Sequence, residues 1–212
     1  MKTIENNIAS VTGYFTSEFV FSHEMFGEKF YLVDLECERL SGAKDVIPVM
    51  VSERSLDINK DYSDCVLEIK GQFRSYNKHD GDKMHLQLSL FAQDIQFLAG
   101  YVVSAENNTI YLDGYICKEP TSRKTPLGRE IADIIIAVNR PYGKTDYIPC
   151  ICWGRNANFS NGLPAGTRLS VIGRIQSRNY QKKLDCGTFE TRTAYEVSIS
   201  QLEVLEDGLR IL

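Results

Sequence analysis

The chain has 212 residues, of which 43% are hydrophobic and 25% charged, and its net charge at neutral pH is −4. This length accommodates one large domain or two of about 100 residues, and the evenly spread apolar residues exclude a disordered protein. The sequence shows neither a run of about 18 apolar residues nor a secretion signal. We therefore expect a cytoplasmic protein with no membrane segment.

An enzyme is not expected. The three histidines, His23, His79 and His85, lack the spacing of metal ligands or of a catalytic triad, and no phosphate-binding glycine loop is present. The six cysteines are expected to be reduced thiols rather than a disulfide framework. Cys150 and Cys152 form the only close pair, without the spacing of a zinc site. The sequence thus predicts no catalytic residues, no metal and no cofactor.

Charge is unevenly divided between the two halves. Residues 1–100 carry 10 lysine and arginine residues against 16 acidic ones, a net charge of −6. Residues 101–212 carry 14 against 12, a net charge of +2. If the protein binds a polyanion, we expect the second half to bind it.

The chain contains an internal duplication. Glu5-Asn6-Asn7 recurs as Glu106-Asn107-Asn108, and the run Asp45-Val46-Ile47-Pro48 recurs as Asp146-Tyr147-Ile148-Pro149 at the same spacing. Arg39 matches Arg140 in the same way, and Gly71 with Ser75 matches Gly173 with Ser177 one residue out of register. The sequence therefore predicts two copies of one unit, residues 1–99 and 106–206, joined near residues 99–105.

Each unit is predicted to be all-β. In the second copy, alternating or continuous apolar patterns predict five strands, at residues 110–116, 131–138, 147–153, 169–176 and 194–199. The polar stretch 155–166 has room for a short helix, whose counterpart in the first copy would be residues 52–64. Five strands with a helix between the third and fourth suit a Greek-key barrel. The predicted fold is therefore all-β, with two tandem OB-fold (five-stranded Greek-key) barrels.

The third strand of the second copy carries a candidate binding surface. Tyr147 and Trp153 are six residues apart, so both rings emerge on one face, while Ile148, Cys150 and Cys152 point the other way. Tyr142 lies just upstream, and the cations Arg140, Lys144 and Arg155 are interleaved with the rings. Such a pattern is typical of a surface that stacks unpaired bases and neutralises phosphates, and structural packing is the alternative explanation.

Several motifs of the second copy occur in an order that resembles the bacterial single-stranded DNA-binding protein family over residues 108–205. They are IYLDGYICKEPTSRKTPLGREIA, IIIAVNRPYG, TDYIPCICWGR, VIGRIQSRNY and TAYEVSISQLEVL. The resemblance implies sequence-independent binding of single-stranded DNA in replication, recombination or repair. It also implies base stacking on Tyr142, Tyr147, Trp153 and Tyr180, and phosphate contacts from Arg123, Arg155 and Arg178.

Further cations lie near these positions. Lys124 and Arg129 fall with Arg123 in the first inter-strand loop, and Lys182 and Lys183 begin the long loop after the fourth strand. Long hairpin loops of OB barrels commonly clasp nucleic acid. Arg174, on the fourth strand, completes the candidate set.

The first copy departs from the family at the aromatic positions, which become Ser41, Val46, Ser52 and either Asn77 or Lys78. We expect it to serve as a scaffold, or to dock a partner protein of replication or recombination. The two first strands, residues 9–14 and 110–115, are expected to meet within the chain or across a homodimer of four barrels. A primosomal-type protein-interaction module with weak nucleic-acid binding, and an RNA-binding OB protein, are the alternatives.

Overall fold

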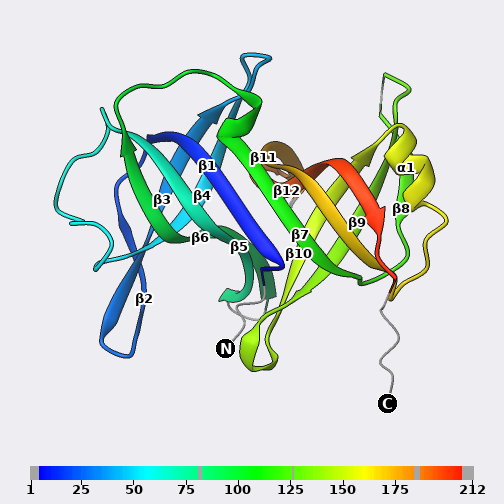
Figure 1. Ribbon diagram of the computed structural model, residues 1–212, viewed down its shortest axis with the longest axis horizontal. Helices are drawn as coiled ribbons and strands as arrows, with labels where there is room; N and C mark the ends of the chain where they lie inside the picture. The colour runs from blue at the N-terminus through cyan, green and yellow to red at the C-terminus, as the bar shows by residue number, and fades with distance from the viewer. Residues whose placement is uncertain (1–4, 81–82, 126, 184–186, 207–212) are drawn as a thin grey trace.

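The computed structural model describes residues 5–80, 83–125, 127–183 and 187–206. The described chain forms two β-barrels that lie side by side (Figure 1). The strands of the first barrel are β1 (Asn7–Phe15), β2 (Val20–Met25), β3 (Glu28–Glu38), β4 (Lys44–Ser52), β5 (Val66–Asp80) and β6 (Lys83–Leu98). The strands of the second barrel are β7 (Asn108–Ile116), β8 (Thr121–Lys124), β9 (Glu130–Asn139), β10 (Thr145–Trp153), β11 (Arg168–Lys183) and β12 (Phe189–Val204).

The two barrels repeat one pairing scheme. In the first, β1 pairs with β3 and β5, β3 pairs with β4, β5 pairs with β6, and β4 pairs with β6 in parallel. Strands β7 and β9–β12 make the same set of pairings in the second. The prediction of two tandem all-β Greek-key barrels is confirmed, and the sequence duplication corresponds to a repeated topology.

The first strands of the two barrels pair with each other inside the chain. β1 and β7 run antiparallel, with Ala9 opposite Ile110, and lie in the centre of the molecule (Figure 1). This pairing joins the strands of both barrels into a single hydrogen-bonded sheet. The expectation that these two strands meet is therefore confirmed, and they meet within one chain. Each strand covers an edge that the other would leave exposed.

The cores and the duplicated asparagines explain why the repeated sequence gives a repeated fold. Alternate residues of the strands point inward and form a continuous apolar core that includes Val11 and Leu35 in the first barrel and Leu112 and Ile136 in the second. Asn108 is buried, donates to the carbonyl of Ile175 at 2.7 Å and accepts from its N–H at 2.9 Å. Asn7 makes the same pair of bonds to Phe73.

Three details differ from the expected elements. The short helix α1 (Arg155–Ser160) lies where it is predicted, but no helix is present at residues 52–64. There, Asp57 and Asp61 accept hydrogen bonds from the backbone two residues on, which favours turns over a helix. Strands β11 and β12 are much longer than the predicted strands at 169–176 and 194–199, and a short additional strand, β2 or β8, precedes β3 or β9.

Two 3₁₀ turns complete the secondary structure, η1 (Ala105–Asn107) before β7 and η2 (Pro141–Gly143) before β10. Within the described ranges, none of the helical segments has the length and apolar character needed to cross a bilayer.

Candidate nucleic-acid interface

Strand β10 presents its rings outward as the alternation predicts. Tyr147 is 45% exposed and Trp153 is 38% exposed, whereas Ile148, Cys150 and Cys152 are buried in the core. The indole Nε1 of Trp153 donates to the hydroxyl of Ser198 on the parallel strand β12 at 3.2 Å. This bond satisfies the polar edge of the ring and fixes its orientation while leaving part of the ring open to solvent.

The other two aromatic candidates occupy different positions. Tyr142 lies in the turn η2, where its φ of 65° is unusual for a residue other than glycine, and its side chain is 91% exposed. Tyr180 is on β11 with 38% exposure, and the guanidinium carbon of Arg178 lies 6.0 Å from its ring centre. All four rings are therefore accessible from solvent.

Trp153 stands at the edge of a groove with a volume of about 650 Å³, which we call the arginine groove. Five arginines line it against a single acidic residue, Glu196. Its lining residues are Arg39, Arg123, Thr125, Arg129, Ile131, Ile151, Trp153, Arg174, Gln176, Ser177, Arg178, Glu196, Ser198, Ile199 and Ser200. A concave surface with this excess of guanidinium groups is suited to an anionic polymer.

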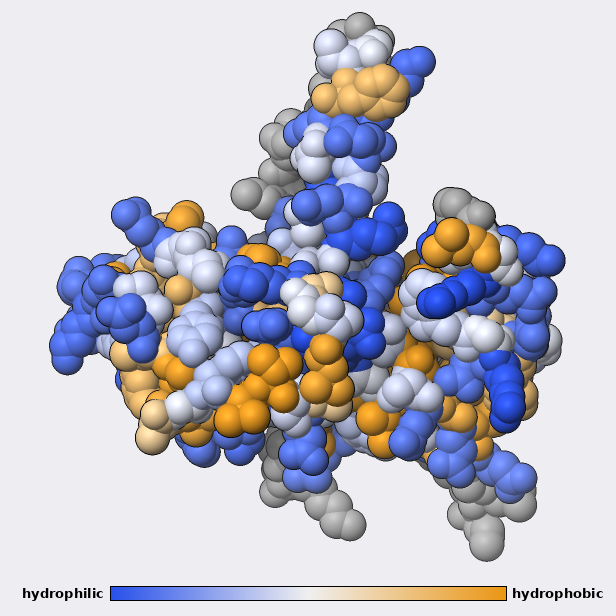
Figure 2. Space-filling view, turned by 90° about the horizontal axis from the view of Figure 1, so that it is seen from above, coloured by the Kyte–Doolittle hydropathy of each residue, from blue (hydrophilic) through white to orange (hydrophobic). Residues whose placement is uncertain are grey.

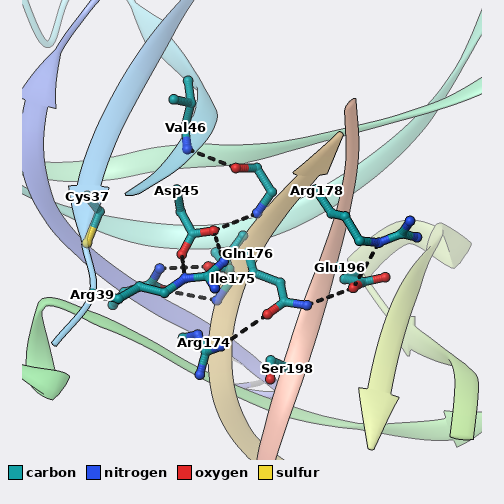
Figure 3. A network of polar contacts seen from close by, with 12 residues as sticks. Cys37, Arg39, Asp45, Val46, Arg174, Ile175, Gln176, Arg178, Glu196 and Ser198 are labelled. Carbon is teal, nitrogen blue, oxygen red and sulfur yellow. Dashed lines mark hydrogen bonds and ion pairs between the residues drawn. The ribbon is translucent and has the colours of Figure 1, made fainter. Parts of the chain in front are cut away.

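Strand alternation builds the floor of this groove. On β11, Arg174, Gln176 and Arg178 are spaced two residues apart and so share a face, opposite the face of the buried Ile175. Glu196 on β12 accepts from the side-chain amide of Gln176 at 2.7 Å and lies 3.8 Å from Nε of Arg178 (Figure 3). Glu196 therefore orders the neighbouring side chains but neutralises only part of the positive charge.

Strand β8 and the turn before β9 supply further cations. Arg123 is on β8 rather than in a loop, and its Nε lies 2.5 Å from Asp133. Lys124 lies 3.7 Å from Glu130, and Arg129 is exposed. Of these three cations, Arg123 and Arg129 line the groove.

Other candidates lie outside the groove lining. Arg140 forms an ion pair with the buried Asp146, with 3.0 Å between Nε and Oδ2, and is not among the lining residues. Lys144, Arg155 and Lys183 are exposed. Tyr142, Tyr147, Tyr180, Lys124 and Lys182 also fall outside the lining. The structure thus brings together five predicted residues, which are Arg123, Arg129, Trp153, Arg174 and Arg178.

Lys182 and Lys183 belong to β11 itself, not to the loop in which the sequence places them. They extend the β11–β12 hairpin, whose register continues to Lys183 opposite Phe189. This hairpin projects from the body as an arm with hydrophilic side chains around its base (Figure 2). The arm therefore places charge next to the groove without lining it.

Sequence reasoning does not identify Arg39, which comes from the first barrel and lines the groove. Arg39 pairs through Nε and Nη2 with both carboxylate oxygens of Asp45. Asp45 Oδ1 also accepts the N–H of Ser177 at 2.8 Å, and the hydroxyl of Ser177 accepts the N–H of Val46 at 3.0 Å (Figure 3). We call this set, with Arg174, the Asp45 junction.

A related set, the Asp146 junction, joins β5 of the first barrel to β10 of the second. Asp146 Oδ1 accepts the N–H of Ser75 at 2.7 Å, and the hydroxyl of Ser75 accepts the N–H of Tyr147 at 2.8 Å. Burial raises the pKa of Asp146 despite the opposing effects of the Ser75 N–H and Arg140. The matching Asp and Ser residues of the duplication therefore hold the barrels together. Their repetition in the sequence was the signal from which the junctions could have been inferred.

The surface of the first barrel that corresponds to the arginine groove is filled by its own side chains. Strand pairing places Phe91 opposite Met50, as it places Ser198 opposite Ile151. The ring of Phe91 packs against Phe30 with 5.8 Å between ring centres, and the Arg74 guanidinium lies 3.8 Å above it. Ser52 stands where the second barrel has Trp153. The first barrel therefore lacks both the open groove and its ring.

Comparison with known proteins is consistent with this geometry. Residues 107–205 match the Single-strand binding protein family. Single-stranded DNA-binding protein 3 of Listeria innocua is 34% identical over 108 residues, covering 48% of this chain and 67% of its own length. Single-stranded DNA-binding protein A of Bacillus subtilis is 35% identical over 108 residues, covering 48% of this chain and 62% of its own. The matched region thus spans about two thirds of the length of these relatives.

Solved structures show that the fold of the whole chain is shared. The wild-type single-stranded DNA binding protein of Thermus aquaticus superposes with a TM-score of 0.69 at 21% identity, covering 95% of this chain and 94% of that one. A deletion mutant of the same protein covers 97% of this chain with the same TM-score. The likeness extends over both barrels. Together with the sequence matches, it shows that this chain belongs to the single-strand binding protein family, a family of non-enzymatic proteins.

Proposed function

We propose that the chain binds single-stranded DNA without regard to base sequence and so protects unpaired strands in replication, recombination or repair. The observation that carries this proposal is the exposed Trp153 ring at the edge of a groove lined by five arginines and one glutamate. An exposed ring accepts the face of any base, and the arginines neutralise the phosphates that join successive bases. The shared family supports the same ligand.

Base stacking supplies the part of the affinity that survives salt. Each stacked base contributes about 1–3 kcal/mol, so four rings give a gross limit of roughly 4–12 kcal/mol before the strand is ordered. Trp153 is the ring that lines the groove, and Tyr142, Tyr147 and Tyr180 are the further exposed rings of the same barrel. We propose that all four stack bases, with Trp153 contributing most because its ring is held by Ser198.

Phosphate neutralisation supplies the salt-dependent part. For single strands, log K falls by about 0.7 per neutralised phosphate for each tenfold rise in salt concentration. Arg129 and Arg178 are exposed in the groove and are the strongest candidates for these contacts. Arg123 is paired with Asp133 and is expected to exchange this partner for a phosphate. Lys124, Lys144, Arg155, Lys182 and Lys183 are proposed as outer contacts.

Trp153 is the only tryptophan of the chain, so its fluorescence reports directly on the proposed site. We expect oligo-dT to quench it strongly. The variant Trp153→Ala should bind a labelled oligo-dT more weakly by about 1–3 kcal/mol, or about 5- to 150-fold, as measured by fluorescence anisotropy. Phe159→Ala provides the control, because Phe159 is also an exposed ring but lies on α1 outside the groove. Equal losses in both variants would contradict the proposal.

The same titration separates the alternatives. A protein-interaction module with weak nucleic-acid binding would leave the Trp153 emission almost unchanged by oligo-dT. An RNA-binding protein would release oligo-dT when oligo-U is added, because recognition of the 2′-hydroxyl would favour the ribose strand.

We further propose that the first barrel is a scaffold and docking surface, and that two chains form a homodimer of four barrels. The filled counterpart of the groove and the acidic charge of residues 1–100 support a role other than stacking bases. One chain has a mass of 24.0 kDa, and multi-angle light scattering should give twice that mass. A mass of one chain at micromolar concentration would exclude the dimer and leave the DNA-binding proposal intact.

A further inference from the structure

The guanidinium of Arg174 lies at the Asp45 junction with too few partners. Its Nη2 donates to Gln176 Oε1 at 3.2 Å, but its Nε is buried and finds no hydrogen-bond partner within the part of the chain that the structure describes. Burial lowers the pKa of Arg174, and the nearby Arg39 lowers it further, whereas Asp45 acts in the opposite direction. The site therefore holds a partly desolvated cation that would gain from an additional anion.

The carboxylate of Asp45 already accepts several hydrogen bonds. Both oxygens of Asp45 bind Arg39, and Oδ1 also accepts the N–H of Ser177. Arg174 lies near this fully buried carboxylate but is bonded to Gln176, so the two arginines together leave a local excess of positive charge (Figure 3). A phosphodiester group carries the single negative charge and the acceptor oxygens that both guanidinium groups can bind.

The two arginines lie between two cavities. Arg39 and Arg174 line the arginine groove and also a second cavity of about 510 Å³ on the side of the first barrel. The second cavity is bordered by Leu40, Ser41 and Ile172, and its acidic lining residue is Glu38. Its apolar and hydroxyl groups suit a nucleoside better than a phosphate, which places the phosphate at the arginines.

We propose, building on the proposed function, that the bound strand continues from Trp153 across the Asp45 junction onto the first barrel. Arg39 and Arg174 together bind one phosphodiester group there, and the adjacent nucleoside enters the second cavity. The first barrel then takes part in binding although it lacks the stacking rings. Binding is asymmetric, because the strand crosses at one junction only.

The Asp146 junction shows why the strand does not cross at the other side. Arg74 occupies the corresponding region, but its guanidinium lies 3.8 Å above the Phe91 ring, and its Nη2 donates to Gln72 at 2.9 Å. Arg140 forms an ion pair with Asp146, as Arg39 does with Asp45, so the two junctions differ at Arg74 and Arg174. The cation that is left open at the Asp45 junction is thus covered by an aromatic ring at the Asp146 junction. Arg74 is therefore a control cation at the other junction of the same chain, at the position that the duplication aligns with Gln176.

The test measures binding of an oligo-dT of about 16 nucleotides, the upper end of the range for one OB barrel, over a series of salt concentrations. Arg174→Gln should lower the magnitude of the slope of log K against log salt by about 0.7, the contribution of one phosphate contact. Arg174→Lys should retain most of the slope because it keeps the charge. Arg74→Gln should bind like the wild type.

A second variant guards against a folding defect or a general effect of net charge. Arg39→Gln combined with Asp45→Asn leaves the net charge unchanged and keeps an acceptor for the Ser177 N–H, yet removes the Arg39 cation. It should lower the slope by a similar amount, about 0.7. Thermal unfolding of each variant verifies that it is folded.

Three results would overturn the proposal. If the wild type quenches Trp153 normally but the slopes of Arg174→Gln and of the double variant equal that of the wild type, the strand does not cross the Asp45 junction, and the proposed function stands. If oligo-dT does not quench Trp153 in the wild type, the proposed function fails, and this inference fails with it. Equal slope losses in Arg174→Gln and Arg74→Gln would also reject the asymmetric path.

Discussion

At the scale of single residues, burial determines which groups of this protein are available for chemistry. Burial raises the pKa of the Cys37 and Cys152 thiols to about 11, and raises that of Cys150 well above its ordinary value. Cys117, in contrast, is exposed at the end of β7. The close pair Cys150 and Cys152 therefore fills the core, as the strand alternation predicts, and is chemically inert.

Alkylation with iodoacetamide at pH 8 tests this difference. The thiolate reacts, and a thiol with a pKa of about 11 is ionised in only about one molecule in a thousand at that pH. We expect Cys117 to be modified at least about 100-fold faster than Cys37 or Cys152, as mapped by peptide mass spectrometry. Because their folded pKa is raised, the two buried thiols should react faster as the pH increases toward 11. Equal rates for Cys117 and Cys152 in the folded protein at pH 8 would contradict this assignment.

At the scale of the elements, the bulge at Gly173 determines how β11 meets β12. The register of the two strands shifts between Ile172 and Gly173, and a Cβ at residue 173 would overlap the carbonyl oxygen of Ser198. Gly71 occupies the matching bulge of the first barrel, against the carbonyl of Phe91. These two glycines match in the duplicated sequence because both backbones approach a neighbouring strand too closely for a side chain.

Gly173→Ala should therefore destabilise the protein by about 1–3 kcal/mol, the usual cost of forcing extra atoms into a packed site. The free energy of unfolding in urea measures this cost. Gly162→Ala is the control, because a Cβ there would meet no atom within 4 Å. The expectation is wrong if the two substitutions change stability equally. Since Ser198 positions Trp153, Gly173→Ala should also weaken oligo-dT binding.

The elements also show which parts of the fold the sequence patterns predict and which they miss. The apolar pattern predicts the ends of β7, β9 and β10 to within two residues. In a half-buried strand, alternate side chains face the core, so the pattern follows the strand. It misses the outer halves of β11 and β12, since residues 178–183 are largely exposed and held by strand pairing instead of burial. The duplication wrongly predicts a helix at residues 52–64, where aspartate side chains stabilise turns.

At the scale of the whole molecule, the duplication predicts both the two barrels and the pairing of their first strands. It does not predict the arginine groove, because that surface depends on how one barrel sits against the other. Arg39 is remote from Arg174 in the sequence and meets it only across the Asp45 junction. Arg140, the counterpart of Arg39, makes the equivalent ion pair with Asp146, but the groove is lined by Arg39 and not by Arg140. Equivalent positions in the two copies thus have different roles.

The antiparallel pairing of β1 with β7 has a consequence for the protein in a cell that also contains related single-barrel proteins. A strand edge that is satisfied within one polypeptide is not offered to another chain. The two halves are joined covalently, so each finds its counterpart at a high effective concentration as soon as both have folded. The pairing therefore disfavours exchange of barrels with related chains. Every molecule keeps one barrel with the four exposed rings at the stacking positions and one barrel without rings at those positions.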